Sequence, residues 1–81
     1  MVIFNLYCNS NREDELIAFD IMDFCEELKK KYDVDYFFMR YVDPKPHVRL
    51  RIKGTQEVLL QIYPLIIKWQ HQLLDDGILV I

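Results

Sequence analysis

Two arginines, Arg49 and Arg51, alternate with apolar residues in the stretch HVRLRIK (47–53). Alternate side chains of a β-strand point to one face, so the two guanidinium groups would stand about 7 Å apart on a single surface. A guanidinium stays charged, and its forked N–H donors match the paired oxygens of a carboxylate or phosphate. The spacing indicates an anion-holding surface, although arginines in this pattern more often only pair with surface acids.

Three further residues are candidates for the same surface. Arg40 lies in the aromatic-rich stretch before the prolines, His47 stands two positions before Arg49, and Tyr7 lies in the first apolar stretch. A histidine has an unperturbed pKa near about 6.5 and can carry protons. More often, a histidine at such a place closes a hairpin by bonding to the backbone. Both interpretations of His47 stay open on sequence grounds.

Other catalytic patterns are not evident in the sequence. His71 has no second histidine or carboxylate at metal-ligand spacing, and neither Cys8 nor Cys25 has a local histidine partner. The chain holds just two glycines and no glycine-rich phosphate loop. We therefore expect no metal site and no cofactor.

Hydrophobic periodicity predicts the elements that must position these residues. Apolar residues at helical spacing predict a helix over Glu13–Lys31, and a second helix begins at Gly54-Thr55 and stops at Gly77. Four stretches are predicted strands: Val2–Cys8, 34–41, 47–53 and the apolar 78–81. The order β-α-β-β-α-β predicts an α+β, ferredoxin-like fold with two helices on one face of an antiparallel sheet.

In such a fold the second face of the sheet is open. If Val48, Leu50 and Ile52 pack under the helices, then His47, Arg49 and Arg51 must project from the open face. The same reasoning predicts that further residues join them on that face: Ile3, Asn5, Tyr7, Tyr36, Phe38 and Arg40. It predicts that Phe37 and Met39 pack inward.

The composition indicates a single-domain protein that neither binds nucleic acid strongly nor spans a membrane. The 81 residues suffice for one domain, and a net charge of -3 makes strong non-specific nucleic-acid binding improbable. Two cysteines, with no export signal, indicate reduced core thiols of a cytoplasmic protein. No apolar run approaches the roughly 18 residues that span a bilayer.

The stretch YFFMRYVDPKPHVRLRIKG resembles a signature of the C-terminal domain of lantibiotic dehydratases and of thiopeptide-type bacteriocin biosynthesis proteins. Ten positions match that pattern in order: Phe37, Phe38, Arg40, Tyr41, Asp43, Pro44, Pro46, His47, Arg49 and Arg51. The flanking segments LYCNSNREDELI and GILVI are similar as well, so the resemblance covers essentially the whole chain. Because the family's domain is longer, the chain resembles its first third, without the downstream catalytic residues.

The resemblance implies a lyase reaction. The family eliminates glutamate from glutamylated serine and threonine residues of a precursor peptide, which leaves dehydroamino acids. It implies that Arg49 and Arg51 are catalytic and hold the departing glutamate or steer the ester. Arg40, His47 and Tyr7, which strand alternation places on the same face, are the candidate substrate-binding residues. The implied partners are the precursor peptide and the remainder of the dehydratase or a partner chain.

Alternatives stay open at this point. Relatives in the same family perform a cycloaddition instead of an elimination, and the hairpin motif does not separate the lantibiotic from the thiopeptide type. A non-catalytic role is the other class of function, in which the open face binds RNA or a peptide or pairs with a second copy. The net charge of -3 and the absence of an RNP signature disfavour RNA.

Overall fold

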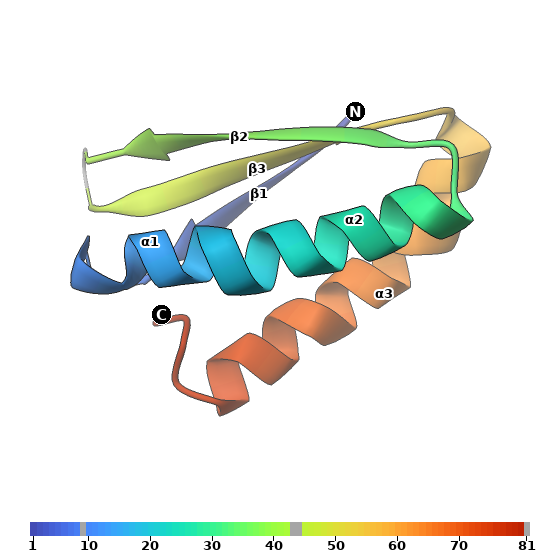
Figure 1. The fold of residues 1–81 in the computed structure, drawn as a ribbon. Coiled ribbons are helices and arrows are strands. Elements are labelled where there is room, and N and C mark those ends of the chain that lie inside the picture. The colour runs from blue at the N-terminus through green and yellow to red at the C-terminus, as the bar shows by residue number, and fades with distance from the viewer. Residues whose placement is uncertain (9, 43–44, 81) are drawn as a thin grey trace.

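Three antiparallel strands form a sheet with two long helical segments against one of its faces (Figure 1). The computed structural model describes residues 1–8, 10–42 and 45–80, except for the side chain of residue 10. The strands β1 (Val2–Tyr7), β2 (Asp35–Tyr41) and β3 (His47–Lys53) lie in the order β1-β3-β2. The predicted α+β class, the first three strands and the placement of both helices are thereby confirmed.

The first helical segment spans the predicted range but is not uniform. A 3-10 turn, η1 (Ser10–Arg12), leads into α1 (Glu13–Glu15), a π-helical stretch η2 (Leu16–Ile21) and then α2 (Met22–Lys31). A π-helix bonds residues five apart, so it brings positions i and i+5 onto one face. Leu16 and Ile21 have this spacing, and both are completely buried. The apolar stripe alone did not reveal this wider turn.

The second long helix, α3 (Gln56–Asp75), begins where the sequence predicts. Thr55 is its N-cap, and the Thr55 hydroxyl accepts a hydrogen bond from the backbone N–H of Val58 at 3.3 Å. Such a bond satisfies one of the amide groups that the first helical turn leaves without a partner. The buried stripe of α3 consists of Leu59, Ile62, Ile66 and Leu73.

The predicted fourth strand is wrong for the residues that the structure describes there, 78–80. Gly77 adopts a positive φ of 76° at the end of α3, and the amides of Ile78 and Leu79 both donate to the carbonyl of Leu73, at 2.9 and 3.2 Å. These amides therefore close the helix end instead of joining a strand ladder. Residue 81, the last of the predicted strand, lies outside the described residues.

The core lies between the sheet and the helices. As predicted, Val48, Leu50 and Ile52 of β3 are completely buried there. Cys8 and Cys25 are buried, free thiols, in agreement with the sequence. Burial, and secondarily the nearby Glu26, raises the pKa of Cys25 to about 12.

The facing of β2 is the reverse of the prediction. Phe37 lies opposite Arg51 and Met39 opposite Arg49 in the antiparallel register, and directly opposed residues share a face of the sheet. Phe37 and Met39 are accordingly exposed, whereas the side chains of Tyr36 and Phe38 pack against the core. The loop between paired strands sets their relative phase, and a shift of one residue exchanges the two faces.

Candidate functional site

The helix-free face of the sheet carries three rows of side chains that cross all three strands, and beyond the last of them lies one further pair, Lys53–Asp35. From one end to the other, the rows are Tyr7–His47–Tyr41, Asn5–Arg49–Met39 and Ile3–Arg51–Phe37. We call these nine residues the open face. It contains two arginines and no carboxylate, and neither arginine forms an ion pair with any residue in the described ranges.

Arg49 is held from two sides. Its Nε donates to the Asn5 side-chain oxygen at 3.2 Å, and its guanidinium carbon lies 4.3 Å from the centre of the Tyr41 ring. The hydrogen bond and the cation–π contact together restrain the plane of the guanidinium. The two terminal nitrogens have no hydrogen-bond acceptor among the described residues, so this end of the fork is available to an anion.

Arg51 is half-buried, and its guanidinium carbon lies 5.5 Å from the centre of the Phe37 ring. Its Nε is buried and lacks a hydrogen-bond partner in the described part of the chain. A buried donor left without an acceptor costs on the order of 1–3 kcal/mol. An oxygen ligand that accepted a hydrogen bond from this Nε–H would therefore remove that cost.

His47 is just 2% exposed, so it is part of the scaffold of the open face and not a group that a solute can reach. Its Nδ1 lies 2.7 Å from the carbonyl oxygen of Lys45, and because a carbonyl only accepts, Nδ1 carries the proton. The ring is flanked by Tyr7 and Tyr41, with centroids 4.9 and 5.4 Å away. The hairpin-closing interpretation of His47 is the one that this geometry supports. Tyr7, a predicted binding residue, does lie on the open face.

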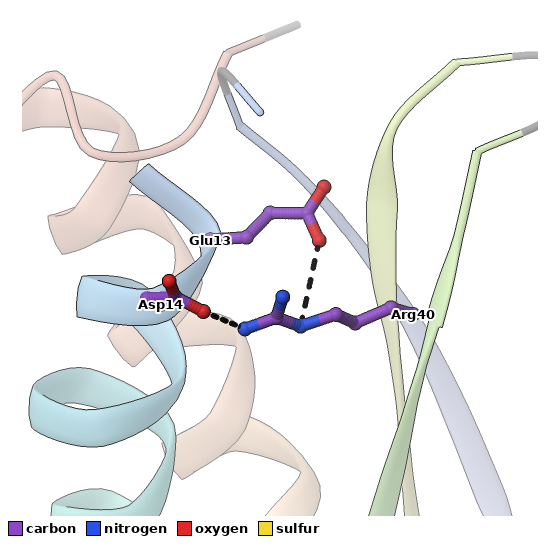
Figure 2. Close-up of polar contacts among 3 residues, drawn as sticks. All are labelled: Glu13, Asp14 and Arg40. Atoms are coloured by element: carbon purple, nitrogen blue, oxygen red, sulfur yellow. Dashed lines mark hydrogen bonds and ion pairs between the residues drawn. The ribbon is translucent and has the colours of Figure 1, made fainter. Parts of the chain in front are cut away.

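Arg40 is not on the open face, and its predicted placement there is wrong. It extends from β2 toward the helical layer, where it bonds to the Asp14 carboxylate and its Nε lies 3.8 Å from Glu13 Oε2 (Figure 2). The hydrogen bond to Asp14 raises the pKa of the Arg40 guanidinium. The cause of the error is the reversed phase of β2. Arg40 ties the end of β2 to α1.

Because Arg40 bonds to the helical layer and not to the open face, its loss should lower the stability of the fold without weakening anion binding. Glu13 is 6% exposed, so Arg40→Gln leaves a buried carboxylate without its cation, and we expect a lower midpoint of urea unfolding. Lys30→Gln is the matched control, because Lys30 and its partner Glu27 are both exposed, and we expect a smaller shift. Binding of an anion to the open face should change by less than about twofold in either variant. Loss of anion binding in Arg40→Gln alone would restore Arg40 to the site.

Three residues hold the arginines; the sequence placed Asn5 on the correct face but missed Tyr41 and Phe37. Asn5 and Tyr41 contact Arg49, and Phe37 lies beside Arg51. They become recognisable once the register is known, since each is directly across from, or diagonal to, the arginine it contacts. In the described part of the chain there is neither a helix long and apolar enough to cross a membrane nor a cluster of three potential metal ligands.

Comparison with known proteins gives a family. The profile of the family described as lantibiotic biosynthesis dehydratase, C-terminal, matches residues 2–80. The chain is 49% identical to the subtilin biosynthesis protein SpaB of Bacillus subtilis over 73 residues, which are 90% of this chain and 7% of SpaB. It is 42% identical to the nisin biosynthesis protein NisB of Lactococcus lactis over 48 residues, 59% of this chain and 5% of NisB. The chain thus spans a small part of these relatives, and it belongs to the family of lantibiotic dehydratase C-terminal domains.

Proposed function

We propose that this chain supplies, within a lantibiotic dehydratase, the surface that holds glutamate while it is eliminated from glutamylated serine and threonine residues of a precursor peptide. The observation that carries this proposal is the pair of open-face arginines, Arg49 and Arg51, which have no ion-pair partner in the described ranges. Both lie on the strand with the R-x-R motif of the family. Subtilin and nisin, named in the relatives, favour the lantibiotic type over the thiopeptide type.

The chemistry fits two fixed cations. A base removes the α-proton of the esterified residue, the electron pair forms the Cα–Cβ double bond, and the Cβ–O bond breaks. The departing glutamate keeps the ester oxygen and leaves as a carboxylate. Cations aimed at the developing enolate and the leaving carboxylate lower the barrier. Arg49 and Arg51 can supply that charge without changing protonation state.

The open face fits anion holding better than proton removal. It carries no carboxylate, and its histidine is buried with Nδ1 committed to the carbonyl of Lys45. We therefore assign Arg49 and Arg51 to glutamate and its ester, Tyr7 to the rim of the same surface, and the proton-accepting base to the remainder of the dehydratase. His47 acts by keeping the rings of Tyr7 and Tyr41 in place.

The proposal includes a ferredoxin-like fold and a place for this chain within a longer domain. The order β1-β3-β2 with both helices on one face suits a ferredoxin-like arrangement whose fourth strand would lie beside β1. The chain then forms one domain that contributes the first third of a longer cytoplasmic lyase domain. Its partners would be the glutamylated precursor peptide and the rest of the dehydratase.

A glutamate-release assay tests the proposal. A dehydratase assembled from this chain and the remaining polypeptide is given a glutamylated precursor peptide, and released glutamate is counted against dehydroamino acids formed. We expect the two products in equal amounts. An assembly that binds the precursor but releases no glutamate would refute an elimination function. Salt-sensitive RNA binding by this chain would support the non-catalytic alternative instead.

Asn5 offers a test of positioning. Asn5→Ala removes the acceptor of the Arg49 Nε–H, so the guanidinium loses one of its two restraints and we expect glutamate release to slow about tenfold. Asn5→Asp should slow release further, because a carboxylate competes with substrate for the Arg49 fork. Asn5→Asp matching the unmodified protein would show that Arg49 does not meet the anion.

A further inference from the structure

We propose that the carboxylate of Asp35 binds the α-ammonium group of the glutamate held by Arg49 and Arg51, so that this side of the sheet selects an amino acid over a plain dicarboxylate. The inference rests on the proposed function, because it concerns the same ligand, and it adds a binding residue outside the nine of the open face. The α-amine of glutamate stays free whichever carboxyl group forms the ester, and a neighbouring carboxylate favours its charged form.

Asp35 lies in line with the two arginines. In the antiparallel register it is opposite Lys53, two residues beyond Arg51 on β3, so it belongs to the helix-free side of the sheet. Diagonal neighbours such as Asp35 and Arg51 have Cα atoms about 7–8 Å apart. The ammonium and carboxylate of an α-amino acid are attached to one carbon atom, so a single ligand can place them on these two residues. Its side-chain carboxylate then extends along β3 toward Arg49.

The carboxylate of Asp35 has room for a second cation. Its side chain is 79% exposed. Oδ1 accepts a hydrogen bond from the backbone N–H of Tyr36 at 3.1 Å and lies 3.7 Å from Nζ of Lys29. Oδ2 has no partner among residues 1–8, 10–42 and 45–80. Because the Lys29 contact is a long and exposed ion pair, it contributes little, and Oδ2 is available to an ammonium donor.

The groups on this side of the sheet complement those of glutamate. Glutamate carries two carboxylates and one ammonium, and it would meet the two guanidinium groups of the open face and the carboxylate of Asp35. Phe37 and Ile3, which are 44% and 52% exposed, lie on either side of Arg51 and can cover the methylene groups of the ligand. A dicarboxylate without an amine would be repelled by Asp35, so this residue supplies a selectivity that the arginines alone lack.

Two titrations of the chain at neutral pH and constant ionic strength, followed through the Nε–H signals of Arg49 and Arg51, test the inference. L-Glutamate and glutarate share a five-carbon chain with two carboxylates, and only glutamate has an ammonium group. In Asp35→Asn we expect glutamate to bind about three- to fivefold more weakly, the upper part of the range for an exposed ion pair. Glutarate should bind this variant as tightly as the unmodified chain or more tightly, because a repelling charge is gone.

Asp75→Asn is the matched control. It removes the same charge from an exposed aspartate at the end of α3, in the helical layer, so both affinities should change by less than about 1.5-fold. Equal weakening of both ligands in Asp35→Asn, or an unchanged affinity for glutamate, would overturn the inference and leave the anion-holding function intact. Failure of both ligands to bind the unmodified chain would refute the inference together with the proposed function.

The assembled dehydratase gives a second readout. The ammonium keeps its charge while the ester bond breaks, so its contact with Asp35 stabilises the bound substrate and the transition state equally. Asp35→Asn should therefore raise KM for the glutamylated precursor about three- to fivefold and change kcat by less than about twofold. A precursor that carries a glutaryl ester should show no rise in KM in the same variant. A fall in kcat at constant KM would contradict a binding role for Asp35.

Discussion

Arg49→Lys in the assembled dehydratase is expected to slow glutamate release by roughly 10²- to 10³-fold, the usual cost of losing one group that stabilises developing charge. Lysine keeps the positive charge but loses the planar fork that meets a carboxylate with two bonds. It also loses the Nε–H that Asn5 accepts and the flat group that stacks on Tyr41. Arg51→Lys should have a similar effect, because its buried Nε would no longer be there to meet an oxygen ligand.

Two comparisons sharpen this prediction. Lys53→Gln removes another cation two residues along the same strand and should change the rate by less than about twofold, so general loss of charge is controlled. The double variant should be little slower than either single variant, because groups that act on one anion are not additive. Glutamate release that is untouched in both Arg49→Ala and Arg51→Ala would end the catalytic assignment.

Alkaline pH should destabilise the fold through Cys25. The thiol ionises at an ordinary pKa of 9.0 in the unfolded chain, but burial raises its pKa to about 12 in the folded protein. Between these values the unfolded state binds fewer protons than the folded state, so the free energy of unfolding falls as pH rises. The difference of about three pKa units corresponds to up to about 4 kcal/mol. Below pH 9 this stabilisation is fully present.

Urea unfolding at intervals between pH 8 and 11 measures this loss. Cys25→Ala lowers stability at every pH by leaving a cavity, but its stability should fall less steeply with pH. Tyr36 also has a pKa raised to about 12, chiefly by burial, so Tyr36→Phe is needed to separate its contribution. Parallel pH dependence in Cys25→Ala and the unmodified chain would show that the buried thiol does not control alkaline stability.

The sequence predicted the face of β3 and missed that of β2, and the difference has a physical origin. His47–Lys53 alternates strictly between apolar and polar residues, so one face can be buried in a single way. Asp35–Tyr41 contains aromatic residues at three consecutive positions and at its end, so either phase buries large apolar groups. The pairing to β3, which fixes the phase, is set by the loop and by the tertiary fold.

In the helices and the site as well, features set by nearby residues were predictable, and contacts between residues far apart in the sequence were not. The bounds of Glu13–Lys31 and the cap at Thr55 follow from nearby residues, and both were predictable. The fourth strand was not predictable. The turn at Gly77 brings the amides of residues 78 and 79 to the carbonyl of Leu73, so these amides bond to the end of α3 and not to a neighbouring strand. The supports of Arg49 come from β1 and β2. Strand alternation already placed Asn5 on the correct face, but its contact with Arg49, and that of Tyr41, could be identified only when the three strands were assembled.

An NMR titration of the chain with glutamate, at constant ionic strength, tests most directly whether the open face holds an anion. The Nε–H signals of Arg49 and Arg51 should shift together and saturate with one affinity, while the signal of Arg40, engaged with Asp14 on the helical side, stays in place. Signals of Arg49 and Arg51 that do not move, or a shift confined to Arg40, would contradict the account.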